Sequence, residues 1–174
     1  MWNEFCDWYI EMVKPRLYYS DSSTSKLAAQ YTLNYVLKNA LKLLHPYMPF
    51  VSEKIYLNLA NVKESLMKED WPVIDSRFDF VNEHSSVENL KEIITGIRNV
   101  RSKMNIHPTK KSDILFVSKD SKNILDAASF IKKLGFGENV IVYKDKNSIP
   151  TNAIAIVAPN MEAYLPLNEL IDKE

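Results

Sequence analysis

The sequence holds few glycines, one cysteine and no long apolar run, and each scarcity excludes a class of protein. Its three glycines, Gly96, Gly135 and Gly137, form neither a glycine-rich phosphate loop nor a dinucleotide-binding fingerprint. The single cysteine, Cys6, excludes an internal disulfide and any zinc site built from several cysteines. No apolar run approaches the roughly 20 residues that span a bilayer, and the acidic start is unlike a secretory signal. These absences favour a cytoplasmic protein.

Recognisable catalytic patterns are missing as well. His45, His84 and His107 stand apart from one another and from carboxylates at metal-ligand spacing. Cys6 has no neighbour in the sequence that would activate a thiol. We therefore expect no catalytic residue, metal site or cofactor site in the chain, because a stand-alone hydrolase would need a nucleophile and a base brought together by the fold.

The chain has no net charge, with 22 basic and 22 acidic residues, so a polyanionic partner would have to be held by a local patch. One stretch offers such a patch. Residues 93 to 111 contain no carboxylate, and the five cations among them are Arg98, Arg101, Lys103, Lys110 and Lys111. This local asymmetry indicates a binding surface.

Apolar periodicity predicts helices over the first part of the chain. Residues 2–13, 26–44 and 51–60 show helical spacing, with Pro15 closing the first segment and a serine-rich linker at 20–25 providing caps for the second. Ser85 and Glu88 have the spacing of a capping box, which predicts the start of a fourth helix that carries the cations. We expect an antiparallel α-helical bundle over residues 1–106.

After Pro108 the apolar period changes from helical to extended. Short runs at 114–117, 140–143 and 153–158 predict strands, and a fourth strand is expected around 163–165. Residues 124–134 have helical spacing and are followed by Gly135 as a stop. The predicted fold class is α+β: the bundle is followed by a small mixed sheet with one covering helix over residues 107–174.

The fourth predicted helix places a polar row at its end. Arg98, Arg101 and Asn105 stand at i, i+3 and i+7, so they are expected on one face. Arginine forks fit phosphate oxygens and asparagine can read a base edge, so this row, with Lys103, is a candidate ridge for unstacked RNA.

Two further cations, Lys14 and Arg16, end the first predicted helix and could add phosphate contacts. The competing interpretation of the polar row is a solvated helix face. Its cations would then pair with acidic residues of the 64–83 segment, and each pair would contribute about 0–1 kcal/mol.

Four blocks of sequence resemble the valyl-tRNA synthetases in the region that follows their catalytic core. They are WNEFCDWYIEMVKPRL at 2–17, LLHPYMPFVSEKIY at 43–56, IRNVRSKMNIHPTKK at 97–111 and YLPLNELID at 164–172. Their order and their spread over nearly the whole chain make the resemblance specific. The chain departs from the family pattern at His107, Lys54 and Tyr56.

The resemblance implies the anticodon-binding bundle and the small α/β subdomain of a class I aminoacyl-tRNA synthetase. The parent enzyme joins valine to its tRNA and uses ATP and Mg²⁺ in its catalytic domain. Neither class I catalytic signature is present in the sequence. The SKMN stretch at 102–105 is not counted as one of them, because it lies within a predicted helix. This part is therefore expected to recognise the anticodon stem and loop without catalysing the reaction.

The implied partners are valine tRNA and the catalytic and editing domains of the parent chain, with no membrane and a monomeric state. The expected tRNA contacts are Arg98, Arg101, Lys103 and Asn105, with Lys14 and Arg16 as secondary contacts. Two alternatives stay open: the equivalent domain of an isoleucyl- or leucyl-type synthetase, and a protein-interaction module that docks an acidic helix.

Overall fold

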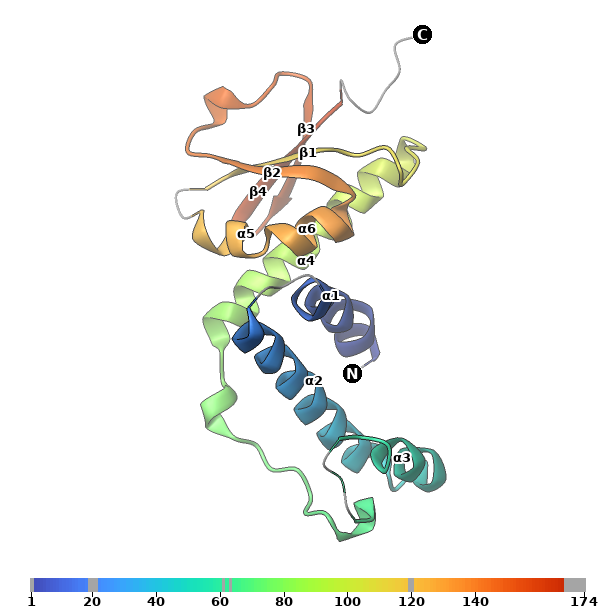
Figure 1. The fold of residues 1–174 in the computed structure, drawn as a ribbon. Helices are drawn as coiled ribbons and strands as arrows, with labels where there is room; N and C mark the ends of the chain where they lie inside the picture. Colours follow the sequence, from blue (N-terminus) through green and yellow to red (C-terminus); the bar gives the residue numbers. More distant parts are fainter. Residues whose placement is uncertain (1, 19–21, 61, 63, 119–120, 168–174) are drawn as a thin grey trace. The chain divides into compact units, whose positions relative to one another are not determined.

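The computed structural model describes residues 2–18, 22–60, 62, 64–118 and 121–167, and the chain divides into two compact units between Asp79 and Phe80. The first unit is helical, and the second combines helices with a sheet (Figure 1). This composition matches the predicted α+β class. The end of the YLPLNELID block, from residue 168 onward, lies outside the described residues.

Helix α2, Ser23–Leu44, is the longest element of the first unit. Ser22 caps its N-terminus, where the serine hydroxyl accepts a hydrogen bond of 3.2 Å from the Ser25 amide, as the serine-rich linker predicted. The other elements of this unit are η1 at Trp2–Tyr9, which has π-helical geometry, α1 at Ile10–Tyr18, α3 at Pro49–Tyr56, and the 3₁₀ turns η2 at Leu66–Lys68 and η3 at Ser76–Phe78.

Pro15 does not close the first helical segment as predicted, because it lies inside α1, which continues to Tyr18. A proline in a helix interior removes its own amide donor and costs about 3 kcal/mol. The residues that follow Pro15 keep their amides and can still donate to the preceding turn. A single missing donor so close to the helix end is therefore tolerated.

A small buried cluster joins α2, α3 and η2. It consists of Leu41, Tyr56 and Leu66, with Leu37, Leu59 and Val62 packed around them. The cluster contains few buried residues for a unit of this length. Other large apolar side chains of the unit face solvent, including Tyr47, Phe50 and Ile74.

A polar node stands beside this cluster. The Tyr56 hydroxyl donates a hydrogen bond of 2.5 Å to Glu69 Oε1, and Lys42 Nζ lies 2.8 Å from Glu69 Oε2. Burial, together with the hydrogen bond to Glu69, raises the pKa of Tyr56 to about 12. The hydrogen bonds from Lys42 and Tyr56 lower the pKa of the Glu69 carboxyl.

The second unit contains helix α4, Val81–Lys103, and a four-stranded sheet. The strands are β1 at Ser112–Val117, β2 at Gly137–Tyr143, β3 at Ala153–Ala158 and β4 at Met161–Pro166, in the order β2-β1-β4-β3. The β1–β2 pair is parallel, whereas β1–β4 and β3–β4 are antiparallel. All four predicted strands are confirmed.

Helices cover one face of this sheet (Figure 1). Two short helices, α5 at Lys122–Asp126 and α6 at Ala128–Gly135, connect the parallel strands β1 and β2, and α4 packs on β3 and β4. The expectation of one covering helix was wrong. The predicted 124–134 helix is broken at Ala127, and the apolar stripe of α4 also needs the sheet to bury it.

The fourth helix also begins earlier than predicted. It starts at Val81 after Phe80, so Ser85 lies inside the helix and does not cap it. Glu88, which a capping box would direct back to the Ser85 amide, instead lies 2.8 Å from Lys91 Nζ. The compact units thus divide the chain before α4, and the predicted domains 1–106 and 107–174 stay a prediction.

The core of the second unit lies between the helices and the sheet. Ile93, Ile97, Ile114, Phe116, Ile131 and Leu165 are among the side chains buried in it. Two glycines permit close packing against Ile114: a Cβ at Gly137 would lie 2.7 Å from Ile114 Cδ1, and one at Gly135 would lie 2.9 Å from the same atom. Helix α6 ends at Gly135 as predicted, and the residue that follows it, Phe136, is left-handed with φ 55°.

Candidate nucleic-acid interface

The C-terminal end of α4 brings the predicted site residues of the second unit together. The helix ends in a Schellman motif, in which the Ile106 amide donates to the Arg101 carbonyl at 2.9 Å and the Asn105 amide donates to the Ser102 carbonyl at 3.1 Å. This motif requires a left-handed residue, and Asn105 supplies it with φ 53°. Asparagine tolerates this conformation better than most residues. Asn105 therefore follows the helix and is not part of its face, although its side chain is exposed.

Arg101 points into the protein. The residue is only 3% exposed, and its Nη2 donates to the His107 carbonyl at 3.1 Å and to the Lys110 carbonyl. Its guanidinium carbon lies 5.6 Å from the centroid of the Phe136 ring, within cation–π range. Burial lowers the pKa of Arg101, but an arginine stays charged. The sequence pattern predicted that this side chain lies in an exposed polar row. In the structure it is buried and holds the turn at 107–110.

Arg98 is attached to the end of another helix. Its Nε donates to the Leu134 carbonyl at 2.8 Å, in the last turn of α6. A cation in this position satisfies a carbonyl that has no partner within the helix and also favours the negative end of the helix dipole. Desolvation lowers the pKa of Arg98, although the residue as a whole is exposed.

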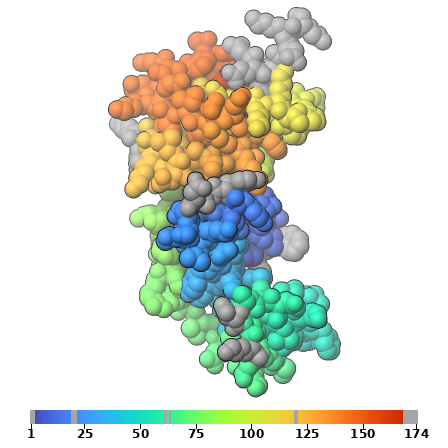
Figure 2. Space-filling view, in the orientation of Figure 1, coloured from blue at the N-terminus to red at the C-terminus, as the bar shows by residue number. Residues whose placement is uncertain are grey.

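The remaining cations of the stretch lie at the surface or at its edge. Lys103 ends α4 and is exposed, and Lys111 is exposed after the turn. The turn itself is closed by a hydrogen bond of 3.0 Å from the Lys110 amide to the His107 carbonyl. Figure 2 shows this part of the chain, in yellow, at the surface of the second unit. The helix end thus combines the buried guanidinium of Arg101 with exposed lysines.

Lys14 and Arg16 belong to α1 in the first unit, whereas the cations of α4 belong to the second. Lys14 pairs with Glu11 one turn earlier. Arg16 reaches the start of α2, where Nε donates to Ser25 Oγ at 3.0 Å and Nη2 donates to the Ser25 carbonyl at 3.1 Å. Both cations therefore have partners within their own unit.

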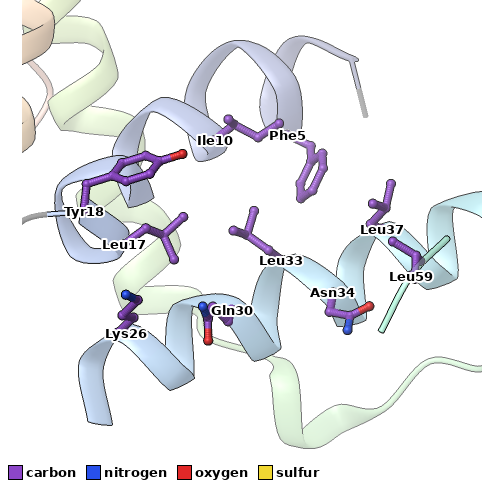
Figure 3. A pocket seen from close by; sticks show the side chains of 10 residues that line it. All are labelled: Phe5, Ile10, Leu17, Tyr18, Lys26, Gln30, Leu33, Asn34, Leu37 and Leu59. Atoms are coloured by element: carbon purple, nitrogen blue, oxygen red, sulfur yellow. The ribbon is translucent and has the colours of Figure 1, made fainter. Parts of the chain in front are cut away.

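A groove in the first unit was not foreseen from the sequence. It has a volume of about 610 Å³ and lies between the first helical segment and α2, with most side chains at its wall apolar (Figure 3). The lining residues include Phe5, Leu17, Leu33 and Leu37, with Gln30 and Asn34 as polar members. The apolar spacing over residues 26–44 predicted a helix, but spacing could not show that part of its apolar surface lines an open groove.

An aromatic face on α2 was missed as well. Tyr31 and Tyr35, which are 67% and 39% exposed, stack at 6.2 Å between ring centroids, and Tyr35 meets Phe78 at 5.3 Å. The i, i+4 spacing of the two tyrosines was the available signal. Exposed rings of this kind can stack on unpaired bases.

Among the residues that the structure describes, no cluster of three or more His, Cys, Asp or Glu could hold a metal ion. In the same ranges, no helix is both long enough and apolar enough to span a membrane.

Comparisons with known proteins identify the family. Residues 1–116 match the model of the anticodon-binding domain of tRNA ligase. Proteins named valine–tRNA ligase are similar along the chain: 36% identity over 175 residues in Clostridium acetobutylicum, 34% over 176 in Clostridium perfringens and 36% over 179 in Carboxydothermus hydrogenoformans. These matches cover 99%, 100% and 100% of this chain, but only 20% of each relative. The chain therefore belongs to the anticodon-binding domain family of tRNA ligases.

Proposed function

We propose that this chain recognises the anticodon stem and loop of a tRNA. The proposal rests on one observation: the segment that matches the anticodon-binding family, residues 1–116, contains the one-signed stretch from 93 to 111. Contacts from its cations to phosphates would supply affinity and register. Contacts to unstacked bases would discriminate between anticodons.

The similarity to proteins named valine–tRNA ligase along the chain supports a more specific role. The chain is part of a valine–tRNA ligase, and its partner is the tRNA for valine. ATP and Mg²⁺ bind to a catalytic domain of the parent chain that lies outside these residues. The parent chain also has an editing domain, and it acts as a monomer in the cytoplasm. No catalytic step is assigned to this chain. Its helices over 1–106 form an antiparallel bundle, followed by the α/β subdomain of 107–174.

The contact surface is centred on the end of α4. Lys103 and Asn105 present exposed side chains there, and Arg98 adds a cation at the end of α6. Lys111 extends this surface beyond the turn. Lys14 and Arg16 are secondary contacts on the first unit.

A titration tests base recognition. The 174-residue chain is titrated with the anticodon stem-loop of valine tRNA and with the same stem-loop carrying an altered anticodon. Tighter binding of the valine stem-loop is expected. Equal binding of the two stem-loops would contradict base recognition. Tighter binding of an isoleucine or leucine stem-loop would mean that the parent is an isoleucyl- or leucyl-type synthetase. Binding of an acidic helical peptide, without binding of RNA, would favour a protein partner.

The dependence of affinity on salt tests the surface. If about five phosphates of a single-stranded loop are neutralised, log affinity should fall against log salt with a slope near −3 to −4. The double variant Lys103→Met/Lys111→Met should reduce the steepness of this slope by about 1.4, because each single-strand phosphate contact contributes about 0.7. Lys54→Met/Lys144→Met removes the same charge from exposed positions elsewhere and should leave the slope unchanged. Equal slopes for the two double variants would contradict the location of the surface.

A further inference from the structure

Two left-handed residues other than glycine occur in the described ranges, and both adjoin Arg101. Asn105 follows the end of α4, and Phe136 follows the end of α6, with φ values of 53° and 55°. The Arg101 carbonyl accepts the Ile106 amide in the motif that fixes Asn105, and the Arg101 guanidinium lies over the Phe136 ring within cation–π range. An aromatic residue in this conformation is strained and persists only where its surroundings hold it.

The same guanidinium holds the turn at 107–110, which contains Lys110 and is followed by Lys111. The His107 carbonyl accepts two donors, the Lys110 amide and Arg101 Nη2, and the Lys110 carbonyl accepts Nη2 as well. Both ends of the turn are therefore tied to one side chain, which is itself anchored in a helix. Charge-assisted bonds of this kind are about twice as strong as neutral ones.

Arg101 cannot bind a phosphate without leaving this position. Its exposed fraction of 3% leaves no surface for an anion. Release would remove the Nη2 donor from both carbonyls and leave the His107 carbonyl with the Lys110 amide alone. Its Nε and Nη1 are buried and have no hydrogen-bond partner among the described residues, so the side chain is held by Nη2 and by the ring. An apolar residue such as methionine could fill the volume but could donate to neither carbonyl.

We propose that Arg101 is a positioning residue of the RNA interface, which acts by holding the turn at 107–110 and so aims the cations on and beside it at the phosphates. Arg101 does not touch the RNA. This inference rests on the proposed function, and it changes the role that the charge pattern assigned to Arg101 from contact to support.

The alternative is a purely structural arginine, whose loss lowers stability without altering the interface. Two measurements separate the roles. Hydrogen exchange at the Lys110 amide reports whether the turn is closed, because that amide donates within the turn. The slope of log affinity against log salt reports how many phosphates are contacted, and a general loss of stability does not change it.

The experiment compares Arg101→Met and Arg101→Lys with Ile131→Val, a mild core variant of the same unit whose side chain is fully buried. Arg101→Met is expected to lose at least tenfold in protection of the Lys110 amide relative to Ile131→Val. It should also bind the valine stem-loop about tenfold more weakly, with a slope less steep by about 1.4, the contribution of two single-strand phosphates. Arg101→Lys should fall between Arg101→Met and the wild type, because a lysine keeps the charge but not the fork.

The positioning role would be overturned if Arg101→Met lost affinity with an unchanged salt slope. It would also be overturned if hydrogen exchange at the Lys110 amide were unchanged in this variant. If Arg101→Met does not fold, Arg101→Lys is judged by the same two readouts. A wild-type chain that binds no stem-loop would instead refute the proposed function. Binding by the wild type with no difference between Arg101→Lys and Ile131→Val would refute only the inference about Arg101.

Discussion

The two units bury their apolar side chains to very different degrees. In the second unit, helices and sheet enclose a continuous core in which Ile97, Ile114 and Phe116 are fully buried. In the first unit, the buried cluster is small, and Tyr47 and Phe50 are 84% and 89% exposed. Extended apolar exposure marks an interaction surface in soluble proteins. The comparison teaches that the second unit has a core of its own, whereas the first buries only a few apolar side chains and leaves large ones at its surface.

The strongest test of this contrast is Phe116→Ala. Removing a fully buried ring from β1 should cost about 3–5 kcal/mol in the free energy of unfolding, because the sheet and its covering helices cannot collapse onto the space. All three tryptophans, Trp2, Trp8 and Trp71, belong to the first unit, so their fluorescence reports that unit, while far-ultraviolet circular dichroism reports both.

The expected result is a lower urea midpoint by circular dichroism with an unchanged midpoint by fluorescence. Leu41→Ala in the first unit is the matched control and should shift the fluorescence midpoint. If Phe116→Ala shifts both midpoints equally, the two units unfold as one body, and the contrast between them does not extend to stability.

The polar node formed by Tyr56, Glu69 and Lys42 predicts that the free energy of unfolding depends on pH, with a full effect of about 2–3 kcal/mol. The pKa of Tyr56 is about 12 in the folded chain against the ordinary 10, so between pH 10 and 12 the folded state keeps a proton that the unfolded state loses. Stability contributed by this group is complete below pH 10 and declines as pH rises toward 12. Tyr56→Phe lacks this decline.

Urea unfolding of both proteins from pH 8 to pH 11 checks the sign. At pH 8 the variant should be less stable by about 1 kcal/mol, because the hydrogen bond to Glu69 is lost. The difference should shrink above pH 10. A constant difference across this range would show that the Tyr56 hydroxyl does not titrate with a raised pKa.

Close packing at the α6–β2 corner gives the next effect. Gly137→Ala would place a methyl group 2.7 Å from Ile114 Cδ1 and should cost about 1–3 kcal/mol through overpacking. Chemical denaturation measures the loss. The double variant Gly137→Ala/Ile114→Val removes the clashing methyl, so it should be more stable than the sum of the single variants predicts. Simple additivity would mean that the clash is not the cause.

Sequence patterns recovered what depends on local periodicity. The α+β class and all four strands followed from apolar spacing, and Ser22 lies in the linker expected to cap α2. Patterns failed where tertiary contacts decide. Glu88 has the spacing of a capping partner for Ser85, but Lys91 is within its reach, and the helix starts one turn earlier.

The candidate site shows the same limit. The charge pattern located the end of α4 as a basic region, since the charge of each residue follows directly from the sequence. The direction in which each side chain points does not. Arg101 turns inward because carbonyls of a turn that follows the helix accept its fork, and no sequence spacing encodes that geometry.

The smallest expected effect concerns Asn105 and sharpens the difference between support and recognition. Glycine adopts a left-handed conformation freely, so Asn105→Gly should change stability by less than about 1 kcal/mol, while Asn105→Ala should cost about 1 kcal/mol. Thermal denaturation ranks the two. If the exposed amide reads a base edge, Asn105→Gly should lose discrimination between the valine stem-loop and its altered form despite full stability. Retained discrimination in a stable Asn105→Gly variant would leave Asn105 with the helix-ending role alone, because the backbone conformation would then account for everything that the residue does.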